Sequence, residues 1–319
     1  MTSARKLSDI ALRAVAVLVA SALVGFGPAA WAQSEATPST PTTLTGTLAK
    51  VRNSGTVTVG YRDSSIPFSY LSARKEPIGY SIELCKQLVD AMSNSVHKTL
   101  AIQWVPVTSA TRIDAVANGQ VDLECGSTTN NLERQKRVAF SPTMFVSGTK
   151  LLVKKGSPIK GFRDLAGKTV AVTAGTTNEK TLRDLSERFK LAINLVVSAD
   201  HAESFGQVKA GKADAFATDD VLLYGFIAED RNAAQGGQSD YQVTGDFLSY
   251  DPYGVMYRKD DPLLAKVINE TFQVLAQDGE IERQYKRWFL RKLPSGTRID
   301  LPMSPQLETI LRTMAARPE

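Results

Sequence analysis

The sequence predicts an α/β protein of two lobes, each a sheet flanked by helices. Short β-rich runs alternate with amphipathic runs at helical spacing from residue 56 to residue 125. The alternation restarts after Phe145, which indicates a second unit of similar construction. Because strand–helix–strand succession favours parallel strands with helices on the sheet faces, we expect a parallel sheet in each lobe.

Three strands and two helices are expected in the first lobe. The longer helix has apolar residues at a spacing that gives one buried face, and Gly119 suits the left-handed end of the second helix. The strands are Thr56–Tyr61, Ile102–Pro106 and Val121–Cys125, and the helices are Ser81–Met92 and Thr111–Ala117.

The second lobe is expected to contain four strands and three helices. The strands are Thr149–Lys154, Thr169–Thr173, Leu195–Val197 and Ala213–Ala217, and the helices are Phe162–Leu165, Asn178–Phe189 and His201–Ala210. After a strand within residues 251–257, two amphipathic helices, Leu263–Leu275 and Glu280–Phe289, are expected.

The N-terminus is typical of a secretory signal peptide spanning residues 1–32. Arg5 and Lys6 precede an apolar run at residues 10–26, and residues 30–32 read Ala-Trp-Ala, a small-x-small cleavage site. The alternative is a membrane anchor, but the apolar run is short and contains Arg13. Residues 33–47 are rich in Ser, Thr and Pro, which predicts a flexible leader on a free periplasmic protein.

Composition gives no support for a nucleic-acid-binding protein or for a metal site, and it limits the function little further. The formal net charge of +5 is weak evidence for an anionic ligand and none for a nucleic-acid partner. Cys85 and Cys125 are compatible with a disulfide or with two buried thiols, because sequence does not give the distance between them. No metal site is expected, since His97 and His201 lack ligand spacing with either cysteine.

The run from Val121 to Asn131, followed by LERQKRV, is the most informative segment. A β-rich stretch ends in Gly126 and small hydroxyl and amide residues, and a helix then begins near Arg134. Backbone N–H groups, short donors and a guanidinium at one point would hold a small carboxylate. The alternative is simple capping, because Asn130-x-x-Glu133 is a capping box.

Several other predicted strands also end in polar residues that start a helix or loop. Ligands of open α/β sheets bind outside such carboxyl ends of strands. The segments are residues 57–70 with Arg62, residues 105–116 with Ser109 and Arg112, residues 170–179 with the capping box of Thr176 and Glu179, and residues 213–223 with Asp219 and Asp220.

These segments resemble the periplasmic solute-binding proteins of the polar amino-acid family, the receptors of ABC importers. The resemblance is to the glutamate/aspartate-binding branch and covers nearly everything from Thr47 to Phe289. It is carried by VTVGYRDSSIPFSY, PIGYSIELC, VPVTSATR, DLECGSTTNNLERQKRVAFS, VTAGTTNE, ADHAESF and ATDDVLL, in the family's order.

The resemblance implies a two-lobed, type II-like periplasmic-binding-protein fold with the ligand in the cleft between the lobes. The first lobe would comprise residues 48–147 and 249–294, and the second lobe residues 148–248, with crossovers near Ser147 and Leu248. Residues 295–319 would form a C-terminal extension. No catalytic residue and no cofactor is implied.

The resemblance also implies roles for the site residues. Arg134 would bind the ligand α-carboxylate with Thr129 and Thr177, and Asp219 would accept from the α-ammonium with help from Ser127. Asp220 would cap the following helix. Residues Arg62, Ser109, Arg112 and His201 would select an acidic side chain.

Three points are open at this stage. We expect His201 to donate as an imidazolium, although a surface histidine at a helix N-terminus is the alternative. The aromatic side chain that forms the floor of the site is either Phe68 or Tyr80. Tyr253 suits packing at the hinge as well as a role in the site.

The implied partners are L-glutamate or L-aspartate and an ABC permease, with a monomeric receptor and no nucleic acid. The alternatives are an adaptor that presents ligand to a chemoreceptor or sensor kinase, and a periplasmic dehydratase or lyase on the same fold.

Overall fold

The structure is a computed structural model that describes residues 43–234 and 237–316. The predicted signal peptide and residues 33–42 of the predicted leader lie outside the described residues. Among the described helices, none combines the length and the apolar character that crossing a membrane requires.

The first sheet has five strands in the order β5-β1-β6-β15-β7. They are β5 (Ala101–Pro106), β1 (Thr56–Tyr61), β6 (Leu123–Glu124), β15 (Met256–Arg258) and β7 (Val138–Phe140). β1 is parallel to β5 and β6, as predicted, whereas β15 runs antiparallel to β6 and β7. The sheet therefore contains strands from two distant parts of the sequence.

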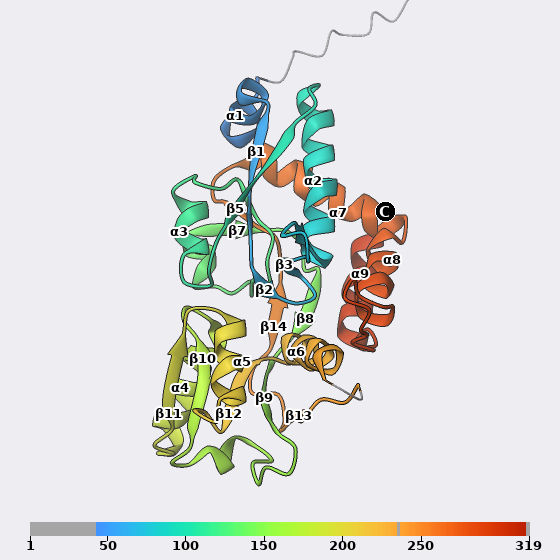
Figure 1. Ribbon diagram of the computed structural model, residues 1–319. Coiled ribbons are helices and arrows are strands. Elements are labelled where there is room, and N and C mark those ends of the chain that lie inside the picture. The colour runs from blue at the N-terminus through green and yellow to red at the C-terminus, as the bar shows by residue number, and fades with distance from the viewer. Residues whose placement is uncertain (1–42, 235–236, 317–319) are drawn as a thin grey trace, which may run out of the picture. The chain divides into compact units, whose positions relative to one another are not determined.

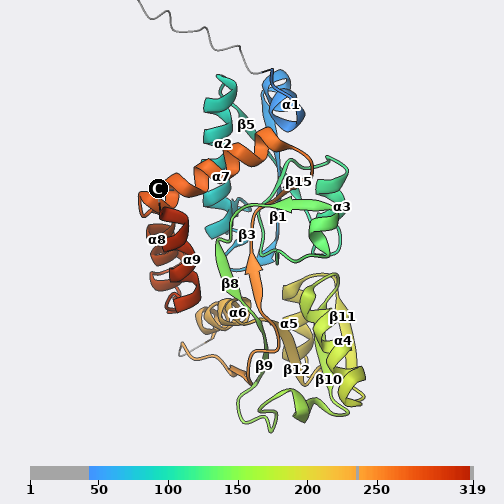
Figure 2. The ribbon, with the colours of Figure 1, turned by 180° about the vertical axis from the view of Figure 1, so that it is seen from behind.

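Helices α2 (Tyr80–Val96) and α7 (Pro262–Gln277) pack against each other beside this sheet (Figure 2). The predicted apolar face of α2 is buried, with Ile82 and Leu88 fully inaccessible. Ile268 of α7 belongs to the same core cluster. The remaining helices of this part are α1 (Gly46–Ser54), α3 (Arg112–Ala117), α8 (Glu280–Tyr285), the π-helix η3 (Lys286–Leu290) and α9 (Pro305–Ala315).

The second sheet has the order β11-β10-β12-β9-β13. These are β11 (Asn194–Ser198), β10 (Thr169–Thr173), β12 (Ala215–Asp219), β9 (Thr149–Lys154) and β13 (Tyr241–Thr244). β10 is parallel to β11 and β12, while β9 is antiparallel to β12 and β13. A purely parallel sheet is thus wrong for both lobes, because one strand in each sheet, β15 or β9, runs opposite to its two neighbours.

Side chains of this sheet alternate between two apolar layers. Leu151 packs with Leu182 of α4 (Thr177–Phe189) on one face. Leu152 packs on the other face with Phe205 of α5 (His201–Lys209) and Phe226 of α6 (Asp220–Ala233). The strand period of two therefore places helices on both faces.

Two antiparallel strands, β8 (Phe145–Ser147) and β14 (Asp251–Tyr253), join the sheets (Figure 1). The chain leaves the first sheet through β8 and returns through β14. The single strand expected within residues 251–257 is two strands, β14 and β15, separated by Gly254 and Val255. Gly254 donates its N–H to the Thr128 carbonyl at 3.2 Å, which ties this break to the loop after β6.

Several elements escaped sequence analysis. Helix α1 begins at Gly46, inside the segment expected to be leader, and α9 lies in the C-terminal extension and packs on α7. A small antiparallel sheet consists of β2 (Ser64–Ser65), β3 (Ser69–Leu71) and β4 (Pro77–Ile78). Strands of two or three residues are too short to show a period, so pattern analysis does not detect them.

Cys85 and Cys125 form a disulfide, with 6.3 Å between their Cα atoms. It links α2 to the residue that follows β6, at the start of the polar loop beginning at Gly126. The structure therefore decides the alternative that sequence left open, and the disulfide anchors one end of the predicted carboxylate-binding segment.

Candidate functional site

All nine predicted site residues follow the carboxyl ends of strands that are parallel in the two sheets. Eight of them are buried, and Thr177 is half-buried. In the first lobe the residues are Arg62 after β1, Ser109 and Arg112 after β5, and Ser127, Thr129 and Arg134 after β6; in the second they are Thr177 after β10, His201 after β11 and Asp219 at the end of β12.

Arg134 lies where the two lobes meet. Its Nη1 donates to the Thr129 carbonyl at 2.8 Å, and its Nη2 donates to the Gly175 carbonyl of the second lobe at 3.4 Å. The hydroxyls of Thr129 and Thr177 are 3.4 Å apart, again across the lobes. Burial, followed by repulsion from Arg112, lowers the pKa of Arg134 to about 10.

The N-terminal capping of the turn that begins at Arg134 differs from the expected capping box. Arg134 begins a single 3₁₀ turn, η1 (Arg134–Lys136), and its N–H donates to Asn131 Oδ1 at 2.9 Å. The expected box of Asn130 and Glu133 is therefore wrong. At α4, Glu179 N–H donates to Thr176 Oγ1 at 3.1 Å as predicted, but the Glu179 carboxylate accepts from Gly175 N–H.

Within the described residues, the guanidinium of Arg112 is hydrogen-bonded through Nη1 but not through Nε. Its Nη1 donates to the Ser127 carbonyl at 3.2 Å and to Thr128 Oγ1 at 2.7 Å. Its Nε is buried and has no hydrogen-bond partner in the described part of the chain. Burial lowers the pKa of Arg112, against the attraction of Glu124.

Arg62 is almost fully buried, with 1% of its surface exposed. Its Nη1 has no hydrogen-bond partner among residues 43–234 and 237–316. Burial, followed by repulsion from Arg112, lowers the pKa of Arg62 to about 9. Two guanidinium groups thus share one buried region and repel each other.

Hydroxyl groups near these cations are also unsatisfied. Ser109 Oγ and Ser127 Oγ are buried and lack partners within the described residues. Each buried polar group without a partner costs about 1–3 kcal/mol. Such groups are rare in folded proteins. Their gathering at residues chosen from sequence indicates that a polar ligand completes these hydrogen bonds.

Asp219 accepts hydrogen bonds from two side chains that sequence analysis did not assign to the site. Asn178 Nδ2 donates to Oδ1 at 2.8 Å, and the Tyr253 hydroxyl donates to Oδ2. Tyr253 is therefore more than hinge packing. Burial, followed by repulsion from Asp251, raises the pKa of Asp219 to about 7.

Asp220 does not have the capping role expected for it. Helix α6 has no side-chain cap hydrogen bond. The Asp220 carboxylate instead accepts from Ser147 Oγ of β8 at 2.6 Å. It therefore ties the start of α6 to a crossover strand.

His201 is buried at the start of α5, with 2% of its surface exposed, so the surface alternative is wrong. Its Nδ1 is 2.9 Å from Thr173 Oγ1. Burial, followed by repulsion from Arg62 and Arg112, lowers the pKa of His201 well below its usual range. Without a ligand, burial and the two cations favour the neutral ring, and the imidazolium expected beside a ligand carboxylate stays a prediction.

The two candidates for an aromatic floor both lie in the aromatic core of the first lobe. Phe68 and Tyr80 have ring centroids 6.0 Å apart and no exposed surface. The Tyr80 hydroxyl donates to the Met144 carbonyl at 3.0 Å. Phe68 packs against Tyr253 with ring centroids 5.1 Å apart, which brings it next to the residue that holds Asp219.

Glu124 is the main residue that sequence analysis missed. It ends β6, is fully buried, and accepts from Thr128 Oγ1 at 2.6 Å. Its carboxylate attracts each of Arg62, Arg112 and Arg134. A signal was present, because Glu124 stands between Leu123 and Cys125 in a strand expected to be buried, and a buried carboxylate needs compensating cations.

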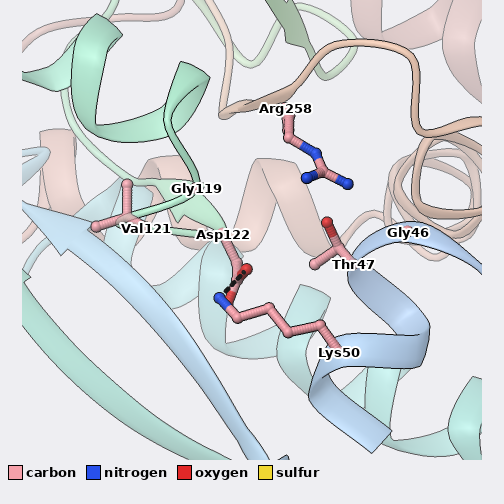
Figure 3. A pocket seen from close by; sticks show the side chains of 7 residues that line it. All are labelled: Gly46, Thr47, Lys50, Gly119, Val121, Asp122 and Arg258. Atoms are coloured by element: carbon pink, nitrogen blue, oxygen red, sulfur yellow. Dashed lines mark hydrogen bonds and ion pairs between the residues drawn. The ribbon is translucent and has the colours of Figure 1, made fainter.

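A hollow of about 270 Å³ lies at the Arg134 end of this cluster, lined by residues that include Asn131, Gly175, Thr177 and Lys180. A smaller hollow of about 90 Å³ lies elsewhere, at the start of α1 (Figure 3). There Lys50 Nζ pairs with Asp122 Oδ1 at 2.8 Å, and Arg258 points toward Thr47. Because that hollow contains none of the predicted residues, the Arg134 end is the better candidate for ligand access.

Residues 57–291 match the bacterial extracellular solute-binding proteins, family 3. The chain belongs to this family. An L-glutamate/L-aspartate-binding protein of Pseudomonas aeruginosa is 43% identical over 84% of this chain and 88% of its own length. A glutamate/aspartate import solute-binding protein of Salmonella typhimurium is 39% identical over 83% of this chain and 87% of its own length.

A solved structure is similar in fold to this chain. It is an ancestral amino acid-binding protein, AncCDT-1, described as a precursor of cyclohexadienyl dehydratase. It is 30% identical, with a TM-score of 0.65, and the match covers 76% of this chain and 99% of that one. The expected two-lobed α/β fold of the family 3 proteins is confirmed.

Proposed function

We propose that this chain binds L-glutamate or L-aspartate outside the cytoplasm, in the periplasm, and delivers it to an ABC permease. The observation that carries the proposal is a pair of buried, unsatisfied donors on two arginines. Arg62 Nη1 and Arg112 Nε are buried and lack hydrogen-bond partners within the described residues. The side-chain carboxylate of an acidic amino acid would accept from them.

Each charged group of such a ligand has a candidate partner. Arg134 and the hydroxyls of Thr129 and Thr177 would bind the α-carboxylate at the point where the lobes meet. Asp219, with Ser127, would accept from the α-ammonium. This arrangement uses charge-assisted hydrogen bonds, which compensate for the loss of water better than neutral ones.

The side-chain carboxylate of the ligand would be bound by the unsatisfied donors of the first lobe. Arg62 Nη1, Arg112 Nε and Ser109 Oγ are buried, and each lacks a partner in the described residues. Neutral His201 would donate from Nε2 if its Nδ1 accepts from Thr173. A neutral side chain would leave the two guanidinium groups without a counter-charge, which is costly in a buried site.

Closure around the ligand is expected to be a hinge motion at the paired crossover strands β8 and β14. The contacts of Arg134 with Gly175 and of Thr129 with Thr177 join the lobes near the site. A ligand that touches both lobes would shift the population toward the closed form. The names of the relatives, which refer to glutamate and aspartate, support the proposed ligand.

The enzyme alternative has one observation in its favour, the likeness to a dehydratase precursor. A dehydratase needs a proton donor over its substrate. His201 and Asp219 are the candidates, and both have binding roles in the proposed complex. We therefore infer a binding protein without catalysis, acting as a monomer.

Calorimetric titration of refolded, ligand-stripped protein tests the proposal. Glutamate and aspartate should bind about a hundredfold more tightly than glutamine and asparagine, since an uncompensated buried charge costs 2–5 kcal/mol. Equal affinities for acids and amides would contradict it. Proton NMR of the saturated mixture over a day would show new product signals if the chain were a dehydratase or lyase.

A further inference from the structure

Glu124 contacts the site through a hydroxyl and forms no direct ion pair in the described part of the chain. Thr128 Oγ1 donates to Glu124 Oε2 at 2.6 Å and accepts from Arg112 Nη1 at 2.7 Å. A hydroxyl has a single proton to donate. Because the Thr128 hydroxyl donates its proton to Glu124, its oxygen can only accept from Arg112. The hydroxyl oxygen therefore holds Arg112 Nη1 in place as its donor.

This contact leaves the other donors of the arginine free. Arg112 Nη1 is used by Thr128 and the Ser127 carbonyl, while Nε remains buried without a partner. A direct bidentate pair with Glu124 would occupy the donors that a ligand needs. The intervening hydroxyl therefore orients the guanidinium without competing with the ligand.

The second carboxylate oxygen of Glu124 lies beside Arg62. A Cβ placed on Gly126 would be 2.3 Å from Glu124 Oε1 and 2.9 Å from Arg62 Cγ, so both side chains border the space that a larger residue at position 126 would occupy. Oε1 has no hydrogen-bond partner in the described residues. The charge of Glu124 attracts Arg62, and a larger residue at position 126 would displace one of the two side chains.

We propose that Glu124 is a specificity residue of this site, which orients Arg112 through Thr128 and selects a ligand that carries an ammonium group. This inference rests on the proposed function. The charge of Glu124 repels both ligand carboxylates but attracts the ammonium, which the site places at Asp219. A dicarboxylate without an amino group feels only the repulsion, so Glu124 disfavours it relative to glutamate.

The size of this effect follows from Coulomb attraction between one carboxylate and one ammonium. For any two opposite unit charges about 8 Å apart, at an effective dielectric constant of about 20, the attraction corresponds to a selectivity of about tenfold or more. Glutarate is the matched probe, because it is glutamate without the amino group. The measured quantity is the ratio of the Kd for glutarate to the Kd for glutamate.

Three variants separate the charge from the orientation. Glu124→Gln keeps an oxygen that accepts from Thr128 and removes the charge. Thr128→Val breaks the link to Arg112 and keeps the charge, and Thr128→Ser restores the hydroxyl. Calorimetry, with competition where glutarate binds weakly, gives both Kd values, and thermal unfolding identifies folded variants.

We expect Glu124→Gln to lower the Kd ratio about tenfold. Thr128→Val should weaken glutamate binding about tenfold, as expected for a buried charged hydrogen bond, and Thr128→Ser should stay within about threefold of the wild type. If glutarate binds the wild type too weakly to measure, its detection with Glu124→Gln supports the proposal, and its absence there contradicts it.

An unchanged ratio in folded Glu124→Gln would overturn the charge role. Equal glutamate affinities for Thr128→Val and Thr128→Ser would overturn the orienting role, and this pair decides the proposal if Glu124→Gln does not fold. Failure of the wild type to bind glutamate would instead contradict the proposed function. The two failures are therefore distinguishable in one set of titrations.

Discussion

The Tyr253 hydroxyl donates a hydrogen bond to the Asp219 carboxylate, which joins crossover strand β14 to the end of β12 in the second lobe. Asn178 Nδ2 donates to the other oxygen at 2.8 Å. Both bonds lower the pKa of Asp219, yet burial and the charge of Asp251 outweigh them and raise it to about 7. The group proposed to bind the ligand ammonium therefore titrates near neutral pH.

This pKa predicts that glutamate affinity falls as the pH drops below about 7. An ammonium beside Asp219 lowers the pKa of the carboxyl in the complex, so binding below pH 7 must release a proton. Affinity is complete above the free-state pKa of about 7 and falls with decreasing pH until the bound-state pKa is reached. The slope between the two values approaches about tenfold per pH unit.

Titrations of the wild type from pH 8.0 to 5.5 measure this dependence, and Asp219→Asn is the control that should bind weakly without it. Tyr253→Phe removes a bond that favours the ionised form, so its affinity should begin to fall at a higher pH. A flat profile in the wild type would contradict a titrating Asp219. Affinity that rises on acidification would instead support the imidazolium of His201.

A second prediction concerns Arg134, which is buried and contacts both lobes. Arg134→Ala should weaken binding of every amino acid by about 2–5 kcal/mol, because the α-carboxylate is common to all of them. Calorimetry with glutamate, aspartate and glutamine measures the loss. Arg312→Ala is a matched control, since its guanidinium pairs with Glu308 at the surface of α9. A folded Arg134→Ala protein with wild-type affinity would place the α-carboxylate elsewhere.

The two remaining arginines should act on selectivity. Arg62→Ala or Arg112→Ala should weaken glutamate and aspartate by about 2–5 kcal/mol and glutamine much less, because only the acids have a second carboxylate for these donors. The ratio of glutamate to glutamine affinity is the deciding measurement. Equal losses of affinity for glutamate and glutamine would show that these arginines support the fold of the site and do not bind the ligand side chain.

Sequence analysis could name candidate site residues because they lie in polar segments at or after the ends of strands. Arg62, Arg112 and Arg134 stand in short polar segments that local pattern reveals. Glu124 was missed because a residue inside a strand reads as part of the sheet, and its three cations come from other segments. The sequence does not decide whether Tyr253 packs at the hinge or belongs to the site, because its hydrogen bond to Asp219 depends on how β14 and β12 meet in space.

The Cys85–Cys125 disulfide should matter for stability and for the loop that follows it. It closes a segment with a sequence separation of 40, so replacing both cysteines with serine should cost about 2–4 kcal/mol of unfolding free energy. Urea unfolding of the oxidised wild type and the double serine variant measures this. Because Gly126 and Ser127 follow Cys125 directly, glutamate affinity should also fall. A variant with unchanged stability would mean that the segment is already confined in the unfolded chain.

Ligand binding should compact the protein and raise its Tm. The contacts between Thr129 and Thr177 and between Arg134 and Gly175 exist only when the lobes meet. A ligand bound by both lobes therefore favours that form, and at a hundredfold excess over Kd it stabilises the native state by about 2.7 kcal/mol. Small-angle scattering and thermal unfolding with and without glutamate provide the two measurements. Arg134→Ala should lose both responses at the same glutamate concentration, whereas Arg312→Ala should keep them. A radius of gyration that stays constant at saturating ligand, together with a raised Tm, would show binding to a form that is already closed and would contradict the hinge motion.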